Sequence, residues 1–347
     1  MTVLVTGGAG FIGTHTLVEL HKAGLDYIVV DNLSNSSARS LEAVSQITGT
    51  EVPFIRGDIT DSRVLSDVID CVTSQGRAVS AAIHFAALKS VAESFNDPLN
   101  YYENNVLGTI RLLQCLTRAG VKNCIFSSSA TVYGEPRQLP FNEAHAIAPT
   151  NPYGQTKAMA ESILANWAGP HSDNKVLSLR YFNPIGAHSS GIIGEDPRGT
   201  PNNLFPYIAR VAQGKLGHLS VFGNDYDTTD GTGVRDYVHV VDIARAHVRA
   251  VSYLSNPHAM GFLAMNLGTG KGTSVMQLVD SFERASKVKI PVRFVARRPG
   301  DVASMWADVS MAEKVLGWKA ELSLAAMCED GWRWQSRNPD GFEGQMS

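Results

Sequence analysis

The sequence feature that most constrains the fold of this chain is a glycine-rich turn placed directly after an apolar, β-branched run. The run Thr2–Thr6 predicts a short buried strand, and Gly7–Gly13 opens a helix that we expect to end near Ala23. Asp26–Val30 predicts the next strand, with Asp31 at its carboxyl end. Strand, glycine turn, helix, strand and terminal acid form the dinucleotide-binding fingerprint in its required context. The pattern predicts an α/β fold with a doubly wound parallel sheet of the Rossmann type.

The same turn indicates which dinucleotide binds. Glycines 7, 10 and 13 allow the tight turn and let the backbone approach a pyrophosphate at the helix N-terminus. Asp31 can accept both hydroxyls of an adenosine ribose and would repel a 2′-phosphate, and Asn32 follows where an arginine could have served NADP. NAD is therefore predicted over NADP. A glycine-rich turn without a ligand is the alternative, and the order of the surrounding elements argues against it.

Two more predicted strands bring candidate contacts to the same edge of the sheet. Val52–Ile55 leads to Asp58, which we expect to meet the adenine amino group. The apolar strand Ala81–Ala87 ends in two alanines that suit the close approach of a cofactor, and Lys89 could reach its ribose. On such a strand, His84 is expected to be a hydrogen-bonded core histidine rather than a ligand.

A tyrosine and a lysine four residues apart indicate a candidate catalytic helix. Tyr153 and Lys157 follow Pro152, and residues at i and i+4 share a helix face, so both side chains can reach one cavity. An unperturbed phenol has a pKa of about 10, and a nearby cation is expected to lower that pKa towards a range useful for proton transfer. The serines at positions 127–129 follow the predicted strand Asn123–Phe126, at the sheet edge where ligands gather. Each feature is common by chance, but together with the glycine turn they predict a catalytic site.

The second half of the chain departs from strand–helix alternation. After the predicted strand Lys175–Arg180, residues 184–235 are rich in Gly, Pro, Asn and Asp, with one helix expected near Leu204–Leu216 and a strand at Ser220–Phe222. Arg235 and Arg298 stand beside turn residues, and two arginines that converge on a diphosphate can make bidentate hydrogen bonds to it. We predict a dinucleotide-binding domain over residues 1–183, with a strand and a helix contributed from about 236–272. A smaller C-terminal α/β substrate lobe is predicted over residues 184–347.

Composition narrows the function further. A length of 347 residues suggests one large domain plus a lobe, and a net charge of −3 gives no electrostatic footprint for nucleic acid or an anionic membrane. The four cysteines have no CxxC spacing, so buried thiols are expected rather than a disulfide framework or a metal site. No apolar run approaches the roughly 18 residues that a membrane span needs, and the chain starts on a strand without a signal peptide. A cytoplasmic protein without bound metal is expected.

The residues singled out above resemble those of a known family. Ser129, Tyr153 and Lys157 resemble the triad of short-chain dehydrogenases/reductases, and the Gly7-x-x-Gly10-x-x-Gly13 spacing resembles the extended branch, which works largely on nucleotide sugars. Long stretches also closely resemble the UDP-glucose 4-epimerase family, and the resemblance runs essentially end to end: they are Tyr181–His188, Glu195–Pro197, Pro201–Ile208, Phe222–Tyr226, Gly231–His239, His84–Lys89 and Trp332–Arg337. The resemblance implies reversible C4 epimerisation of UDP-galactose and UDP-glucose through a 4-keto sugar, with NAD as a retained cofactor.

The resemblance also implies roles for individual residues. It implies that Tyr153 is the base, that Lys157 holds its phenolate and that Ser129 hydrogen-bonds O4 of the sugar. The implied NAD contacts are Gly7, Gly10, Phe11, Ile12, Gly13, Asp31, Asn32, Leu33, Ser34, Asn35, Ser36, Asp58, Ile59, Phe85, Ala86, Ala87, Leu88, Lys89, Asn104, Ser129, Tyr153, Lys157 and Phe182. The implied UDP-hexose contacts are Ser129, Tyr153, Asn183, Asn203, Leu204, Phe222, Arg235, Tyr237, Arg298, Asp301 and Met305. The family forms homodimers through two helices per subunit, here about 100–119 and 153–168; in the first, apolar residues cover more than one face.

One position and two alternative functions stay open. Met305 stands where members restricted to UDP-glucose and UDP-galactose carry a tyrosine and more permissive members a small residue, so it does not decide the breadth towards UDP-N-acetylhexosamines. A nucleotide-sugar 4,6-dehydratase shares the first oxidation step, but related dehydratases carry Asp-Glu where this chain has Ala130-Thr131. A catalytically silent NAD-binding protein is the other alternative, and the presence of all three triad residues argues against it.

Overall fold

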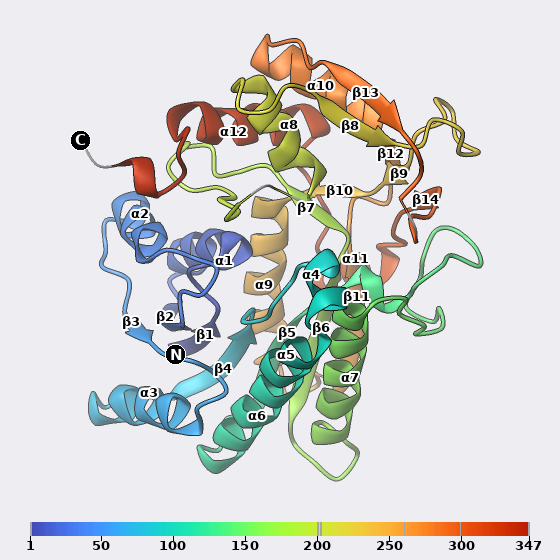
Figure 1. The fold of residues 1–347 in the computed structure, drawn as a ribbon. Coiled ribbons are helices and arrows are strands. Elements are labelled where there is room, and N and C mark those ends of the chain that lie inside the picture. The colour runs from blue at the N-terminus through green and yellow to red at the C-terminus, as the bar shows by residue number, and fades with distance from the viewer. Residues whose placement is uncertain (1, 200, 202, 260, 299, 346–347) are drawn as a thin grey trace.

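A parallel sheet of seven strands forms the centre of the molecule (Figure 1). The structure, a computed structural model, describes residues 2–199, 201, 203–259, 261–298 and 300–345. The strand order is β11-β6-β5-β4-β1-β2-β3, and every pairing in it is parallel. The strands are β1 (Thr2–Thr6), β2 (Asp26–Asp31), β3 (Phe54–Arg56), β4 (Val79–His84), β5 (Asn123–Ser129), β6 (Lys175–Tyr181) and β11 (Phe262–Leu267). This architecture confirms the predicted doubly wound α/β fold.

Helices cover both faces of the sheet, which explains why its central strands are mostly buried. One face packs against α1 (Phe11–Lys22), α2 (Ala38–Thr48), α9 (Val240–Leu254) and α11 (Ser310–Leu316). The other face packs against α3 (Ser62–Ser74), α6 (Gly108–Arg118) and α7 (Pro152–Trp167). In β1 all five residues are buried, and Val3 and Leu4 point into opposite cores. His84 bridges the hydroxyls of Thr6 and Thr109, as expected of a core histidine.

The segment after Pro98 is helical to Arg118, but its middle turn is wide. It consists of α5 (Pro98–Tyr102), a π-helical turn (Glu103–Leu107) and α6, and it is preceded by α4 (Val91–Asn96). Asn105 lies in the wide turn and is buried. Its amide accepts a hydrogen bond from the N–H of Leu88 and donates to the carbonyl of Leu88 and to Thr156. The π turn therefore ties the loop after β4 to helix α7, and such turns are frequent at functional sites.

The remaining elements form a second group above the carboxyl ends of the central strands (Figure 1). They comprise a short 3₁₀ turn at Ala130–Val132, strands β7 (Asn183–Ile185), β8 (Leu219–Phe222), β9 (Val234–Arg235), β10 (Tyr237–His239), β12 (Thr273–Ser274), β13 (Val292–Val295) and β14 (Ser304–Met305), helices α8 (Leu204–Ala212), α10 (Val275–Ser286) and α12 (Leu324–Arg337), and a final 3₁₀ turn at Glu343–Gln345. Phe205, Ile208, Leu278, Phe282 and Met327 centre a separate apolar core there.

The end of one helix in this upper group differs from the sequence-based expectation. Helix α8 ends at Ala212 rather than near Leu216, because Gly214 adopts a positive φ of 73° and ends the helix with its N–H on the Val211 carbonyl. Helix α9 and strand β11 lie between elements of the upper group in sequence but pack into the central sheet. The proposed domain boundary at residue 183 stays a prediction. Within the described ranges, no helix is both long and apolar enough to cross a membrane.

Candidate active site

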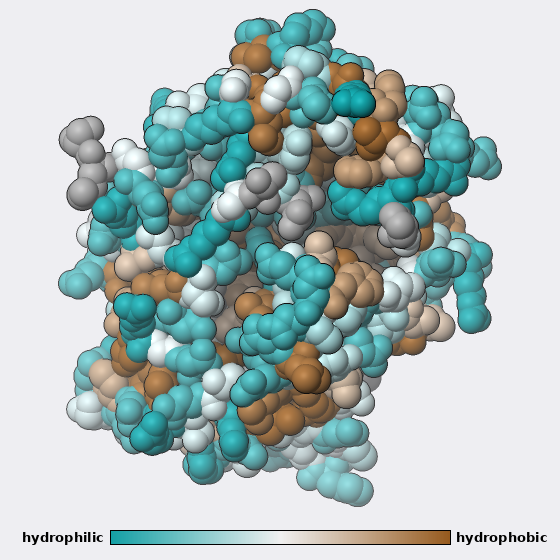
Figure 2. Space-filling model, in the orientation of Figure 1, coloured by the Kyte–Doolittle hydropathy of each residue, from teal (hydrophilic) through white to brown (hydrophobic). Residues whose placement is uncertain are grey.

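A cavity of about 730 Å³ lies between the carboxyl ends of the central strands and the upper group of elements. The space-filling view shows the surface hollowed between these two parts of the molecule (Figure 2). The cavity extends from the glycine turn after β1 to residues of β8, β9 and α8. Strand β1 lies between β2 and β4. The strand order therefore reverses at β1: β2 and β3 are added on one side of it, and β4, β5 and β6 on the other. Ligands of open α/β sheets bind at such a switch point.

The glycine turn forms a close-fitting cradle at one end of the cavity. Gly7 has a φ of 72°, and a Cβ there would lie 2.5 Å from the backbone nitrogen of Ala86. A Cβ on Gly13 would lie 2.6 Å from the Gly7 carbonyl oxygen. Helix α1 begins at Phe11, and Gly10 offers its first-turn N–H groups no side-chain cap. These N–H groups have no acceptor within the helix, so the turn fits a pyrophosphate.

Asp31 is held at the end of β2 by donors from three directions. Its carboxylate accepts hydrogen bonds from the N–H of Ala9 at 3.0 Å, the N–H of Leu33 at 2.9 Å and the hydroxyl of Ser36 at 2.9 Å. Leu33 reaches this position with a φ of 60°. The side chain of Asp31 is mostly buried but lies on the cavity wall. A fixed anion beside the cradle fits the ribose hydroxyls of NAD and would repel the 2′-phosphate of NADP.

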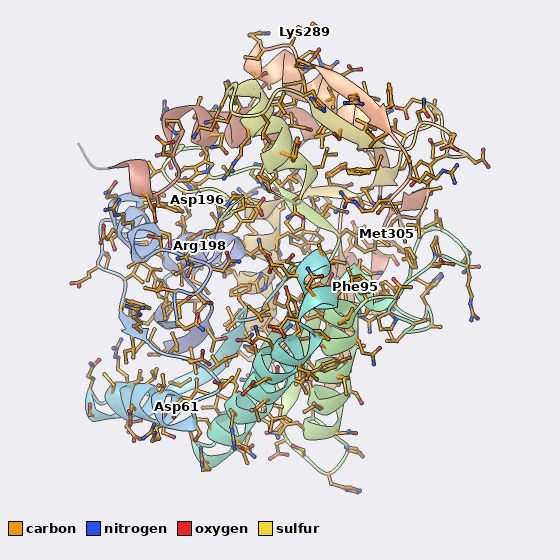
Figure 3. All side chains as sticks on the ribbon, viewed as in Figure 1. Asp61, Phe95, Asp196, Arg198, Lys289 and Met305 are labelled. Carbon is orange, nitrogen blue, oxygen red and sulfur yellow. The ribbon has the colours of Figure 1, made fainter. Side chains whose placement is uncertain are left out.

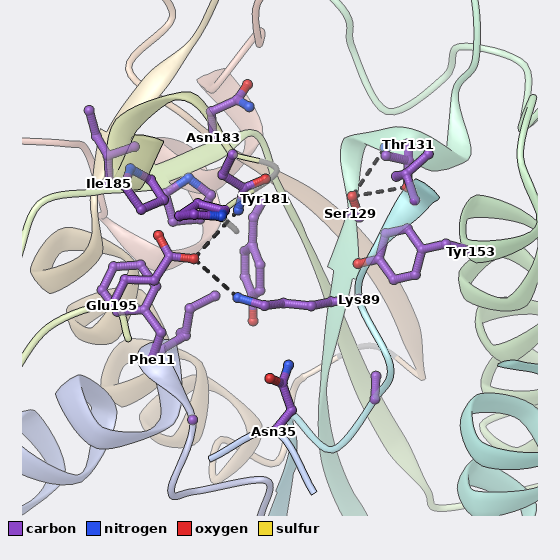
Figure 4. Close-up of a pocket in the computed structure, with 18 of the residues that line it drawn as sticks. Phe11, Asn35, Lys89, Ser129, Thr131, Tyr153, Tyr181, Asn183, Ile185 and Glu195 are labelled. Carbon is purple, nitrogen blue, oxygen red and sulfur yellow. Dashed lines mark hydrogen bonds and ion pairs between the residues drawn. The ribbon is translucent and has the colours of Figure 1, made fainter. Parts of the chain in front are cut away.

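Strand β5 and helix α7 bring Ser129, Tyr153 and Lys157 to the same cavity. Asn151 caps α7 by accepting the N–H of Gly154 at 2.8 Å, and Pro152 occupies the first turn. The hydroxyls of Ser129 and Tyr153 point into one space (Figure 4). The Ser129 oxygen accepts hydrogen bonds from the N–H and the hydroxyl of Thr131. Neither contact uses the Ser129 proton, which can therefore be donated on the cavity side, towards Tyr153 or a ligand.

The pKa values of Tyr153 and Lys157 differ from the expectation. Burial raises the pKa of Tyr153 to about 12, and a side-chain hydrogen bond with Ser129 opposes this rise only in part. Burial also lowers the pKa of Lys157 to about 7. The Lys157 ammonium donates to the Ser127 carbonyl at 2.7 Å and lies 5.9 Å from the centroid of the Tyr153 ring. The phenol pKa is therefore raised where the sequence predicted that a nearby cation would lower it, because desolvation is the largest effect on Tyr153.

The upper group supplies two arginines to the far end of the cavity. Arg235 donates to the carbonyls of Val234 and Val302 and lies 3.7 Å from the Asp301 carboxylate. The Arg298 guanidinium lies over the Phe222 ring, 4.3 Å from its centroid. Asn183, Asn203, Leu204 and Tyr237 also line this end. The arrangement offers cations and an aromatic face to a nucleoside diphosphate.

Of the predicted catalytic, cofactor-binding and substrate-binding residues, Leu33, Asp58 and Met305 do not line the cavity, whereas the others do. Leu33 turns its backbone towards Asp31. The carboxylate of Asp58 is engaged by Asn32 and Thr60; burial would raise the pKa of this carboxyl, but these hydrogen bonds outweigh burial and lower it. Met305 lies in β14 (Figure 3), pairs with Arg235 and packs against the apolar cluster that includes Phe182.

Other lining residues were missed by the sequence analysis. Glu195 lines the cavity and accepts hydrogen bonds from Lys89 at 3.2 Å and Asn203 at 3.4 Å (Figure 4). Tyr181 also lines the cavity, and its hydroxyl lies 2.7 Å from His247 Nε2. Tyr181 ends strand β6, so the rule that ligands gather at carboxyl strand ends could have found it. In the part of the chain that the structure describes, no group of three or more His, Cys, Asp or Glu side chains could hold a metal ion.

Comparison with known proteins agrees with this geometry. The family model described as GDP-mannose 4,6 dehydratase matches residues 4–331, and together with the fold it places the chain among the extended short-chain dehydrogenases/reductases. The UDP-glucose 4-epimerase of Bacillus subtilis is 52% identical over 343 residues, which are 99% of each protein. That of Bos taurus is 51% identical over 350 residues and also covers 99% of each. The chain belongs to the UDP-glucose 4-epimerase family.

Solved structures of similar proteins contain ligands. A UDP-glucose 4-epimerase from Stenotrophomonas maltophila, with bound NAD and formylated UDP-arabinopyranose, has a TM-score of 0.94 and 48% identity; the match covers 98% of this chain and 99% of that one. The enzyme from Bifidobacterium longum in complex with NAD⁺ and UDP has a TM-score of 0.92 and 48% identity over 98% of this chain and 100% of that one.

Proposed function

We propose that this chain is an NAD-dependent UDP-glucose 4-epimerase that interconverts UDP-galactose and UDP-glucose in nucleotide-sugar metabolism. The observation that carries the proposal is the composition of one continuous cavity. It has a dinucleotide cradle with Asp31 at one end, two arginines at the other, and the hydroxyls of Ser129 and Tyr153 between them. A nucleotide cofactor and a nucleotide sugar can therefore meet at a proton-transferring pair.

The residues present fit NAD. The first-turn N–H groups of α1 would bind its pyrophosphate, Asp31 its adenosine ribose, and Lys89 and Lys157 the part nearest the catalytic pair. Bound NAD supplies a hydride acceptor and donor at C4 of the sugar, with no net oxidation. Its positive charge, added to that of Lys157, would also favour the Tyr153 phenolate that burial disfavours.

The chain's own groups move the proton and hold the substrate. Tyr153 removes the O4 proton and later returns it, while Ser129 hydrogen-bonds O4 with the proton that its contacts with Thr131 leave free. Arg235 and Arg298 bind the diphosphate and Phe222 packs on the base, so UDP stays anchored while the 4-keto sugar turns over. Return of hydride to the opposite face of C4 then inverts its configuration.

A homodimer and a cytoplasmic location belong to the same proposal. Helices α6 and α7 share an apolar surface depression lined by Ile110, Leu113, Gln114, Thr117, Arg118, Ile163 and Trp167. Met159 on α7 is 41% exposed beside it. A second copy packed on these helices would cover this surface. All four cysteines are unpaired, which supports a reducing compartment.

Incubation with UDP-galactose, without added oxidant, tests the proposed reaction. Sugar analysis should show UDP-glucose accumulating to an equilibrium mixture that is also reached from UDP-glucose. A 4-keto-6-deoxy product would show a 4,6-dehydratase instead. Bound NAD without any turnover would show a silent binding protein.

A further inference from the structure

One buried carboxylate joins the catalytic helix to the strands beside it. Glu161 lies on α7, one turn beyond Lys157, and is 5% exposed. Its Oε1 accepts hydrogen bonds from the hydroxyls of Ser128 at 2.6 Å and Ser178 at 2.8 Å and from Arg180 Nε at 2.9 Å. Arg180 Nη2 donates to Oε2 at 2.6 Å. Both oxygens of the carboxylate therefore accept hydrogen bonds, from donors on the two strands β5 and β6.

The position of Ser128 makes this link relevant to the active site. Ser128 stands between Ser127, whose carbonyl accepts the Lys157 ammonium, and Ser129, which faces Tyr153. In the register of β5 and β6, Ser128 pairs with Arg180, so both side chains point from one face of the sheet towards Glu161. A shift of α7 along β5 would break the Glu161 hydrogen bonds and the Lys157 contact together.

The Glu161 carboxylate also acts electrostatically on the buried lysine. The titratable and charged groups around Lys157 in the described chain are Tyr153 and Glu161 on α7, Arg180 and Tyr181 on β6, and His84 on β4. Burial lowers the pKa of His84 to about 3, so it is neutral. Burial lowers the pKa of Lys157 as well, and the Glu161 carboxylate opposes that effect.

We propose that Glu161 is a positioning residue for the reaction proposed above: paired with Arg180, it fixes α7 against β5 and favours the cationic form of Lys157. A buried ion pair contributes little net stability and can often be replaced by apolar residues. A positional and electrostatic role explains why charged groups occupy this site between a helix and two strands.

Two matched pairs of variants separate position from charge. Ser128→Ala and Ser178→Ala each remove one donor to the same oxygen, but only Ser128 lies in the strand that carries the active-site serines. We expect turnover of UDP-galactose to fall about tenfold in Ser128→Ala and to change less than twofold in Ser178→Ala. The double variant Glu161→Met/Arg180→Met removes both charges without leaving one buried and unpaired. Tyr133→Phe, its control, removes another partner of Arg180 but leaves the ion pair intact.

The double variant should fold. The pH above which its activity falls should be about one unit lower than in the unmodified protein, and an NMR titration should show the same downward shift in the pKa of the Lys157 ammonium. Tyr133→Phe should show neither change. The titration, assigned with Lys157→Met, needs no turnover, so it tests Glu161 even if the unmodified protein fails to epimerise UDP-galactose. An unmoved Lys157 titration in the double variant, or equal turnover in the two serine variants, would overturn the proposal.

Discussion

At the scale of single residues, the active site depends on keeping a buried phenol able to release its proton. Burial raises the pKa of Tyr153 to about 12 and lowers that of Lys157 to about 7, so at neutral pH the phenol keeps its proton and the lysine loses part of its positive charge. Tyr153→Phe keeps the ring and removes the ionisable oxygen. We expect turnover to fall by about 10²–10⁴-fold, while UDP affinity measured by calorimetry stays unchanged. Turnover within a few-fold of the unmodified protein would exclude Tyr153 as the base.

Met305 is a second residue whose effect can be measured. It packs against the cluster that includes Phe182, which lines the cavity, so its influence on substrate breadth would pass through Phe182. We expect the unmodified protein to prefer UDP-galactose over UDP-N-acetylgalactosamine by roughly tenfold in kcat/KM, a penalty of about 1.4 kcal/mol for displaced packing. Met305→Gly should raise the second activity and Met305→Leu should not. If the unmodified protein had equal kcat/KM for both substrates, Met305 would not determine the substrate selectivity.

At the scale of elements, the turn between β1 and α1 should respond sharply to one methyl group. Gly13→Ala would place a Cβ 2.6 Å from the Gly7 carbonyl oxygen, so the helix must move away from the cradle. We expect the variant to lose about 1–3 kcal/mol of stability and to be purified with much less NAD. NAD released on denaturation and thermal unfolding measure the two effects. Gly217→Ala is the control, because its Cβ would have no atom within 4 Å; full NAD content in Gly13→Ala would show that close packing of the turn is not required.

Local elements were predictable wherever one short segment carries the whole signal. The β1 turn, helix α1 and the acid that ends β2 are contiguous, so spacing alone identifies them. The contact of Glu195 with Lys89 was not predictable, because it joins segments 106 residues apart across the cavity. Spacing also could not show that the Lys157 ammonium bonds to the Ser127 carbonyl, since that depends on how deeply α7 packs on β5. Asp58 was placed near the cavity by its position after a strand and by resemblance, and Met305 by resemblance alone; the hydrogen bonds of the first and the packing of the second depend on tertiary context.

At the scale of the whole molecule, cofactor choice follows from two parts of the sheet meeting at one edge. The Asp31 carboxylate at the end of β2 stands beside the cradle formed after β1. We expect purified protein to release NAD(H) on denaturation and to contain no NADP(H), because a 2′-phosphate would meet a fixed anion. Chromatography of the released nucleotide measures this. Stoichiometric NADP(H) would contradict the role of Asp31.

Assembly and catalysis share helix α7, because the apolar face proposed for dimerisation lies on the helix that carries Tyr153 and Lys157 at its start. Met159, Ile163 and Trp167 follow one another at i+4 spacing on that face. Met159→Glu would place a charge in the dimer contact at an exposed position, with little cost to the fold. We expect sedimentation to show mainly monomer at concentrations where the unmodified protein is dimeric, with lower turnover because α7 loses its outer support. Phe294→Glu makes the same kind of change at another exposed apolar side chain, on β13, and should leave the dimer intact. A dimer that persists in Met159→Glu would mean that the subunits meet through a different surface.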